Sequence, residues 1–344
     1  MIQVVKIEDS IGFPLAHDIT EIVPGQYKGP AFMRGQIVKR DDLEHLRRLG
    51  KNHLYILQPE QYEMHEDDAV VELANALCGK GVSWSGNPRE GKIELKASFN
   101  GLFKADVDAL MRFNTTGDVM CATMHTNTVV EKGQQVASTR AIPLLVPRAN
   151  VNAAAVAARS ASRGVLSVLP MKKAKAGLII TGDEVYYGRI EDKFEKIMRK
   201  KVAEFGGDIC DVVFLPDDDQ RISEAALRLV EKGVNVLLTT GGMSVDADDR
   251  TRHALKMAGA RDIVYGSAVL PGAMFMVAYL RDVPVLGTPA CGMYAARTIL
   301  DLVYPRVLAG EKITRHEIAK LGHGGLCLKC DVCRYPKCAF GKAN

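Results

Sequence analysis

The segment LLTTGGMSVDADDRT, residues 237–251, joins an apolar run to two glycines and then to three aspartates. Gly241 and Gly242 let the main chain approach an anion closely and adopt positive φ, and the N-terminus of a following helix would add partial positive charge. Ser244 can donate a further hydrogen bond. The segment is therefore compatible with a phosphate-binding loop, although a Gly-Gly turn after a strand is more often plain turn geometry.

Two further polar turns follow apolar runs earlier in the chain. These are TGDE at 181–184 and PDD at 216–218, which precede TTGG at 239–242. Ligands of parallel α/β sheets bind at the carboxyl ends of the strands, so we expect the three turns to meet on one edge. Carboxylates beside a phosphate usually need a divalent cation, typically Mg²⁺. A simpler alternative is that Asp217–Asp219 caps the helix that begins near Arg221.

Strand-like and helix-like segments alternate from Lys175 onward and would position these turns. Short apolar runs alternate with segments whose apolar residues recur at helical spacing. This alternation predicts an α/β fold, a three-layer domain at 171–315 with a mostly parallel sheet and right-handed crossovers. The predicted strands lie within 175–185, 208–218, 234–240 and 272–292, and the predicted helices within 191–207, 220–233 and 293–310.

Four cysteines near the end of the sequence have a spacing that suits a metal centre. Their pattern is C-x2-C-x2-C-x4-C, formed by Cys327, Cys330, Cys333 and Cys338. Thiolates bind zinc and iron–sulfur clusters strongly, and four within a dozen residues can surround one centre. The pattern leaves zinc and iron–sulfur both open, and four free thiols on a disordered tail is the alternative.

The composition is that of an ordinary globular protein. The 344 residues suit two or three modules, here a mixed α+β region at 1–170, the α/β domain and a short Cys-rich tail at 316–344. With 45 basic and 41 acidic side chains, a dedicated nucleic-acid surface is not expected. The sequence has no apolar run of membrane-spanning length and no secretory signal. We therefore predict a cytoplasmic protein.

The motifs TGDEV, PDD, TTGGMSVDADD and PVLGTPACG, in this order, resemble the molybdopterin-binding domain shared by the MoeA and MogA lineages of molybdenum-cofactor biosynthesis. The resemblance covers roughly residues 175–310. The front motifs AHDIT, KGPAFMRGQIV and STRAIPLLVPR are more loosely similar to the modules that precede this domain in MoeA-type proteins.

The resemblance implies a pterin site at the ends of the strands. It implies contact of Gly241, Gly242 and Ser244 with the terminal phosphate of molybdopterin or adenylylated molybdopterin. Its acidic positions imply a magnesium-dependent release of AMP and insertion of molybdate. The implied catalytic residues are Asp183, Asp218 and Asp249, and the other implied ligand-binding residues are Thr181, Gly182, Thr240, Asp246, Pro289 and Cys291.

Two departures from the MoeA pattern leave the activity open. Asp246 stands where glycine is common, and Pro289-Ala290-Cys291-Gly292 replaces a Gly-Asn-Pro loop. The sequence therefore supports a molybdopterin molybdenumtransferase-like enzyme or, as an alternative, a non-catalytic carrier, scaffold or sensor that docks to a client molybdoenzyme. A nucleotide pyrophosphatase is the third hypothesis. The resemblance also implies a homodimer.

Overall fold

The computed structural model describes residues 2–57, 60–243 and 250–342. Their contacts divide the chain into two compact units. Unit 1 comprises Met1–Met124 and Val130–Val168, and unit 2 comprises His125–Val129 and Leu169–Asn344. Within the described ranges, no helix is long and apolar enough to cross a membrane.

Unit 1 begins with two antiparallel strand pairs and a short helix. β1 (Ile2–Lys6) pairs with β4 (His53–Leu57), and β2 (Ile19–Val23) pairs with β3 (Tyr27–Phe32). The short helix is α1 (Asp42–Arg48). The buried core of this part consists of Ile7, Leu15, Ile19, Phe32, Val38, Leu46 and Leu54.

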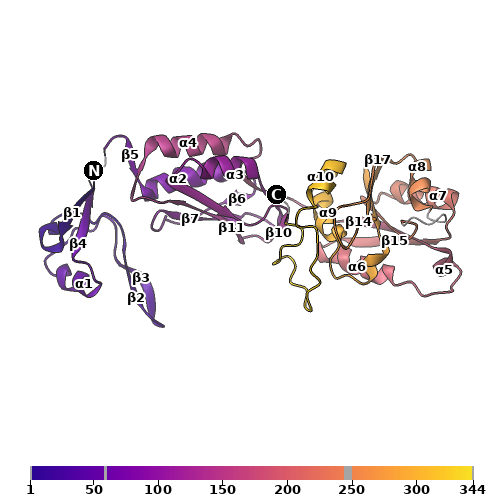
Figure 1. The fold of residues 1–344 in the computed structure, drawn as a ribbon, viewed down its shortest axis with the longest axis horizontal. Helices are drawn as coiled ribbons and strands as arrows, with labels where there is room; N and C mark the ends of the chain where they lie inside the picture. Colours follow the sequence, from indigo (N-terminus) through magenta and orange to yellow (C-terminus); the bar gives the residue numbers. More distant parts are fainter. Residues whose placement is uncertain (1, 58–59, 244–249, 343–344) are drawn as a thin grey trace. The chain divides into compact units, whose positions relative to one another are not determined.

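The rest of unit 1 packs three helices with a four-stranded sheet (Figure 1). In β7 (Lys92–Ala97) every second residue is buried, which is the period of a strand with one face toward a core. This region is α+β, as predicted. The order of strands in the sheet is β6 (Val82–Ser83), β7, β11 (Gln135–Ala141) and β9 (Val119–Thr123). The helices are α2 (Glu66–Leu77), α3 (Val107–Asn114) and α4 (Arg148–Arg159). The remaining short strands are β5 (Glu63–His65), β8 (Gly101–Ala105), β12 (Leu145–Pro147) and β13 (Leu166–Leu169).

Unit 2 is built on a six-stranded sheet in the order β15-β14-β16-β19-β18-β17. The short strand β10 (Thr128–Val130) has residues in both units. The β14, β15, β16 and β19 strands run parallel, and β18 and β17 are antiparallel to their neighbours. The strands are β14 (Lys175–Thr181), β15 (Asp208–Leu215), β16 (Val236–Thr240), β17 (Arg261–Tyr265), β18 (Met276–Leu280) and β19 (Val283–Thr288).

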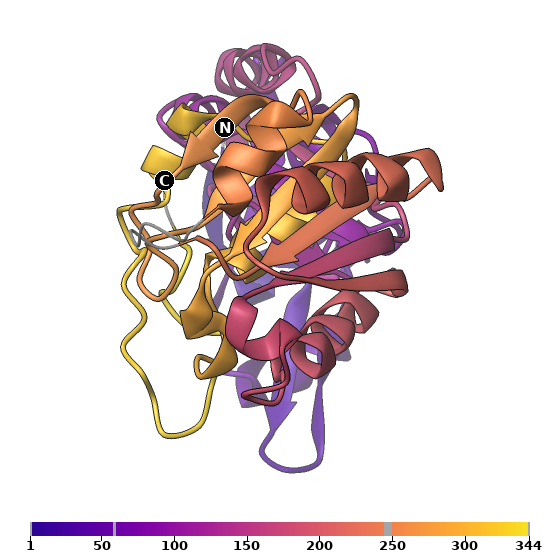
Figure 2. The same ribbon diagram turned by 90° about the vertical axis from the view of Figure 1, so that its right-hand side faces the viewer.

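Helices cover both faces of this sheet, so the unit has three layers (Figure 2). Alternate residues of β14 face opposite cores: Leu178 and Ile180 pack in one, and Ile179 packs in the other. Because both faces are covered, the strand is apolar throughout rather than alternating. The helices are α5 (Asp183–Tyr186), α6 (Phe194–Glu204), α7 (Asp219–Glu231), α8 (Thr251–Met257), α9 (Ile299–Leu308) and α10 (Arg315–Lys320).

The helix predicted within 293–310 begins later, at Ile299. Thr298 caps it with a capping box, in which the Thr298 side chain accepts from Leu300 N–H and the Asp301 carboxylate accepts from Thr298 N–H. Residues 290–293 instead form one turn of 3₁₀ helix. The cap fixes the helix start and leaves Pro289–Met293 as a loop after β19.

Candidate functional site

The loops after β14, β15, β16 and β19 all lie at the carboxyl edge of the sheet, because these four strands are parallel. Thr181 ends β14, and its buried hydroxyl lies 3.2 Å from the hydroxyl of Thr251 and 3.4 Å from the carbonyl oxygen of Thr240. These contacts hold the ends of β14 and β16 and the start of α8 together. Thr240, the last residue of β16, is itself fully buried.

The two glycines after β16 are required by the packing of the protein itself. Gly241 has φ +84°, and a Cβ atom there would lie 2.1 Å from the carbonyl oxygen of Thr181. Gly242 has φ +57°, and its Cβ would lie 2.4 Å from the hydroxyl of Thr251. From the sequence, we attribute these glycines to the close approach of an anion. The structure shows that contacts within the protein, with Thr181 and Thr251, require them as well. Their main chain is still exposed to a pocket.

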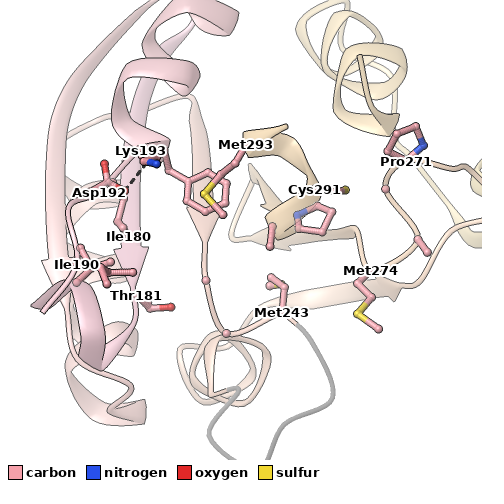
Figure 3. A pocket seen from close by; sticks show the side chains of 18 of the residues that line it. Ile180, Thr181, Ile190, Asp192, Lys193, Met243, Pro271, Met274, Cys291 and Met293 are labelled. Carbon is pink, nitrogen blue, oxygen red and sulfur yellow. Dashed lines mark hydrogen bonds between the residues drawn. The ribbon is translucent and has the colours of Figure 1, made fainter. Parts of the chain in front are cut away.

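This pocket, of about 800 Å³, lies at the edge of the sheet (Figure 3). Thr181 and Ile190 are on one side of it, Pro271 and Met274 are on the other, and Met243 lies between them. Gly241, Gly242, Pro289 and Cys291, predicted from the sequence, all line it together with Thr181. The apolar part of the lining includes Ile180, Val185, Ile190, Phe194, Met243, Met274 and Met293.

The acidic residues that line the pocket differ from those that the sequence singles out. They are Glu184, Glu191 and Asp192, accompanied by Lys193. Asp192 also starts α6, because its carboxylate accepts from the N–H groups of Phe194 and Glu195 at 3.0 and 2.8 Å. Glu184 belongs to the TGDE motif, and this position next to Asp183 is the sequence feature that could have identified it as a pocket residue. The Lys193 ammonium adds positive charge at this side.

Asp183 and the PDD turn form a separate acidic group beside the pocket. The N–H of Asp183 donates to the Asp217 carboxylate at 3.1 Å, and the N–H of Asp217 donates to the Asp183 carboxylate at 3.2 Å. Asp218 caps α7 by accepting from Arg221 N–H at 2.8 Å. The capping alternative is therefore confirmed for Asp218. The turns after β14 and β15 meet, as expected.

The other residues predicted to bind the ligand differ in their surroundings. Gly182, with φ +140°, lies against the Glu184 carboxylate, which a Cβ atom would approach to 2.9 Å. Burial raises the pKa of the Cys291 thiol above its usual value. Ser244, Asp246 and Asp249 lie outside the described residues.

The four tail cysteines line a second cavity, of about 670 Å³, together with Cys291. Cys330 and Cys333 are exposed, whereas Cys327 and Cys338 pack against the apolar core of unit 2. Among the described residues, no group of three or more His, Cys, Asp or Glu side chains is arranged to hold a metal ion. The arrangement of these thiols therefore does not support the predicted zinc or iron–sulfur centre.

Comparison with known proteins assigns the domain that contains the pocket. Residues 177–309 match a family described as "Probable molybdopterin binding domain". This part of the chain belongs to that family. The matched residues include most of β14, all of β16 and β19, and most of the residues that line the pocket. Residues 4–58 match a "Domain of unknown function (DUF8806)".

Curated relatives match a short part of the chain. A "CinA-like protein" of Mycobacterium tuberculosis (strain ATCC 25618 / H37Rv) is 34% identical over 92 residues, which are 26% of this chain and 21% of that protein. A "Putative competence-damage inducible protein" of Bacillus cytotoxicus is 32% identical over 95 residues, 28% of this chain and 23% of that protein. The chain thus spans about a fifth of the length of these relatives.

Solved structures also resemble part of the chain. The protein CinA from Thermoplasma acidophilum is 15% identical with a TM-score of 0.35, covering 40% of this chain and 99% of that chain. The molybdopterin biosynthesis enzyme MoaB from Thermus thermophilus is 18% identical with a TM-score of 0.34, covering 40% of this chain and 98% of that chain.

The pocket of the molybdopterin-binding domain has the features that a phosphorylated pterin requires. Its volume lies in the range typical of small-molecule sites. Gly241 and Gly242 contribute main chain without side chains to the lining. The apolar side chains of the lining provide a surface that a ring system can contact. Lys193 and Lys329 can balance negative charge on the ligand, in a lining that also contains the carboxylates of Glu184, Glu191 and Asp192. The residues present therefore fit this group.

Proposed function

We propose that unit 2 binds molybdopterin or adenylylated molybdopterin in this pocket. The observation that carries the proposal is that the glycine pair after β16 lines the same pocket as an apolar wall, within a molybdopterin-binding domain. The main-chain N–H groups of Gly241 and Gly242 would bind the terminal phosphate. Ile190, Met243 and Met293 would contact the pterin rings, excluding water from them.

We further propose that the site acts as a molybdopterin molybdenumtransferase in which AMP is released and molybdate is inserted. Mg²⁺ in phosphate sites commonly takes only one or two carboxylates, and phosphate oxygens and water complete its shell. Asp183 and Asp218, on the two adjoining turns, would supply carboxylates to such an ion. We propose that the protein is a cytoplasmic homodimer. The cysteine tail would bind zinc or an iron–sulfur cluster only after its four cysteines rearrange.

A carrier or scaffold for the pterin is the second candidate, and a specific observation favours it. Asp183 and Asp217 already accept hydrogen bonds from each other's main chain, and Asp218 already caps α7. These hydrogen bonds give the carboxylates a structural role that does not depend on catalysis. In this alternative the protein would deliver the bound pterin to a client molybdoenzyme.

The test is to incubate the purified chain with adenylylated molybdopterin, Mg²⁺ and molybdate, and to measure bound pterin, released AMP and pterin-bound molybdenum. AMP release with molybdenum uptake supports the transferase, and binding without turnover supports the carrier. Hydrolysis of unrelated dinucleotides would instead indicate a nucleotide pyrophosphatase. Absence of pterin binding would refute the proposal as a whole.

Two variants sharpen this test. Asp218→Asn retains helix capping, because asparagine caps as well as aspartate, so a loss of AMP release would report on the lost charge. The matched control is Asp211→Asn on β15, where the carboxylate pairs with Lys232 at 2.6 Å on the surface. We expect the control to keep wild-type turnover. Unchanged AMP release in both variants would contradict a catalytic role for Asp218.

A further inference from the structure

The cysteine tail forms a loop whose two ends are fixed to unit 2. At its start, the N–H of Cys327 donates to the carbonyl of Leu270 at 2.8 Å. At its end, the N–H of Gly341 donates to the carbonyl of Gly324 at 2.9 Å, and Phe340 is buried. Figure 2 shows this loop in yellow. We name residues 326–340 the thiol loop.

The second cavity lies against the thiol loop and has an unusual chemical lining. Five thiols line it, those of Cys291 and of the four tail cysteines. Its charged lining residues are Arg297, Lys329 and Arg334, and none of its lining residues, all of which the structure describes, is an aspartate or glutamate. The cavity therefore combines soft sulfur atoms with positive charge.

The positive charge of this cavity comes mainly from two residues. Arg297 is already neutralised, because its guanidinium pairs with Glu204 at 2.8 Å and with Asp301 at 2.9 Å. In the part of the chain that the structure describes, no ion pair involves Lys329 or Arg334. These two side chains are thus available to an anionic ligand.

The cavity adjoins the pterin pocket. Pro271, Cys291, Leu326, Cys327 and Lys329 line both of them. A ligand held in the second cavity would therefore lie next to a ligand in the first. Lys329 is the charged residue of the tail that lines both cavities, so it can contact either ligand.

From these features we infer that the thiol loop and Cys291 form a binding site for a tetrahedral metal oxyanion, molybdate or tungstate, next to the pterin pocket. This inference rests on the proposed function, because it names where the inorganic substrate of that reaction is held. Lys329 and Arg334 balance the dianion's charge, as cationic side chains do for phosphate. The thiols distinguish it from sulfate or phosphate, because molybdenum and tungsten can exchange an oxo group for a thiolate: the thiol proton leaves with that oxygen as hydroxide, and the metal keeps its oxidation state.

The experiment is a calorimetric titration of the free protein, without pterin, with sodium molybdate, sodium tungstate and sodium sulfate. We expect molybdate and tungstate to bind, and sulfate to bind at least about tenfold more weakly. The double variant Lys329→Ala/Arg334→Ala should bind molybdate about tenfold more weakly, since each exposed charge contributes modestly. Lys337→Ala is the matched control, because Lys337 lies in the same loop outside the cavity lining and should leave binding unchanged.

Thiol alkylation provides a second measurement. Saturating molybdate should slow the alkylation of Cys327 and Cys338, and the exposed Cys210, which lies on β15, should react at an unchanged rate. Equal affinity for sulfate, equal loss in Lys337→Ala, or absence of thiol protection would each overturn the inference. This titration contains no pterin, so its result is independent of the pterin-binding assay described above. Molybdate binding together with an absence of pterin binding would refute the proposed function and leave the molybdate site standing.

Discussion

Glu66 makes the stability of unit 1 depend on pH in a predictable direction. It lies in the first turn of α2 and is only 7% exposed. Burial, followed by the nearby charge of Asp67, raises the pKa of its carboxyl group from 4.5 to about 7. The folded state therefore binds more protons than the unfolded state between these values. Unit 1 should lose stability as the pH rises from about 4.5 to about 7, and should change little above that.

The size of the effect follows from the two pKa values. They differ by about 2.5, which corresponds to at most about 3 kcal/mol because one pKa unit is worth 1.36 kcal/mol. Glu66→Gln removes the ionisation and keeps the shape of the side chain. We expect the variant to be more stable than wild type at pH 8 by up to about 3 kcal/mol, and to match it near pH 4.5.

The assay can be confined to unit 1, because Trp84 is the only tryptophan of the chain and lies in that unit, with its Nε1–H donating to Asn75 at 3.1 Å. Urea unfolding followed by tryptophan fluorescence at several pH values would give the free energy of unfolding. Glu72→Gln, at an exposed position on the same helix, should keep the wild-type pH dependence. A Glu66→Gln variant with that same dependence would refute the reasoning.

Two further substitutions test the packing of unit 2. Gly241→Ala should destabilise unit 2 by more than Gly188→Ala. Both glycines have positive φ, but a Cβ atom at Gly241 would lie against Thr181, whereas a Cβ atom at Gly188 would meet open space. We expect about 1 kcal/mol for Gly188→Ala and clearly more for Gly241→Ala in thermal unfolding, and equal losses would contradict the steric argument. Asp301→Ala should cost about 3–5 kcal/mol in urea unfolding, because it leaves the buried Lys201 ammonium without the carboxylate 2.7 Å away and also removes the capping box of α9 and an ion-pair partner of Arg297. A loss below about 1 kcal/mol would show that Lys201 reaches water.

The elements of unit 2 could be predicted because their signals are local. The run KAGLIIT is long enough for one strand and apolar on both faces, and β14 occupies those residues. The two strands predicted around Arg281-Asp282 are β18 and β19, and Arg281 adopts the positive φ of a tight turn. Once β14, β15 and β16 are parallel, their carboxyl ends meet by geometry. The meeting of the polar turns was therefore accessible from the sequence.

The pocket lining was less accessible because it depends on segments distant in sequence. Leu326 and Lys329 reach the pocket from more than 80 residues beyond Gly241, and no local pattern signals this. The contacts of Gly241 with Thr181 are likewise tertiary. The predicted zinc or iron–sulfur centre of the tail found no support for the same reason. The spacing of the cysteines shows which thiols are near in sequence, whereas tertiary packing decides which of them are exposed.

The choice between enzyme and carrier depends on how the acidic turns use their oxygen atoms. The bond from Asp217 N–H engages Oδ1 of Asp183, and the bond from Arg221 N–H engages Oδ1 of Asp218. A carboxylate has about four lone-pair sites on two oxygens, so one such bond positions the group without exhausting it. The same contacts that fix these turns also leave acceptor capacity for Mg²⁺. Structural use of Asp183 and Asp218 is therefore compatible with catalysis, and the AMP-release assay on Asp218→Asn separates the two roles.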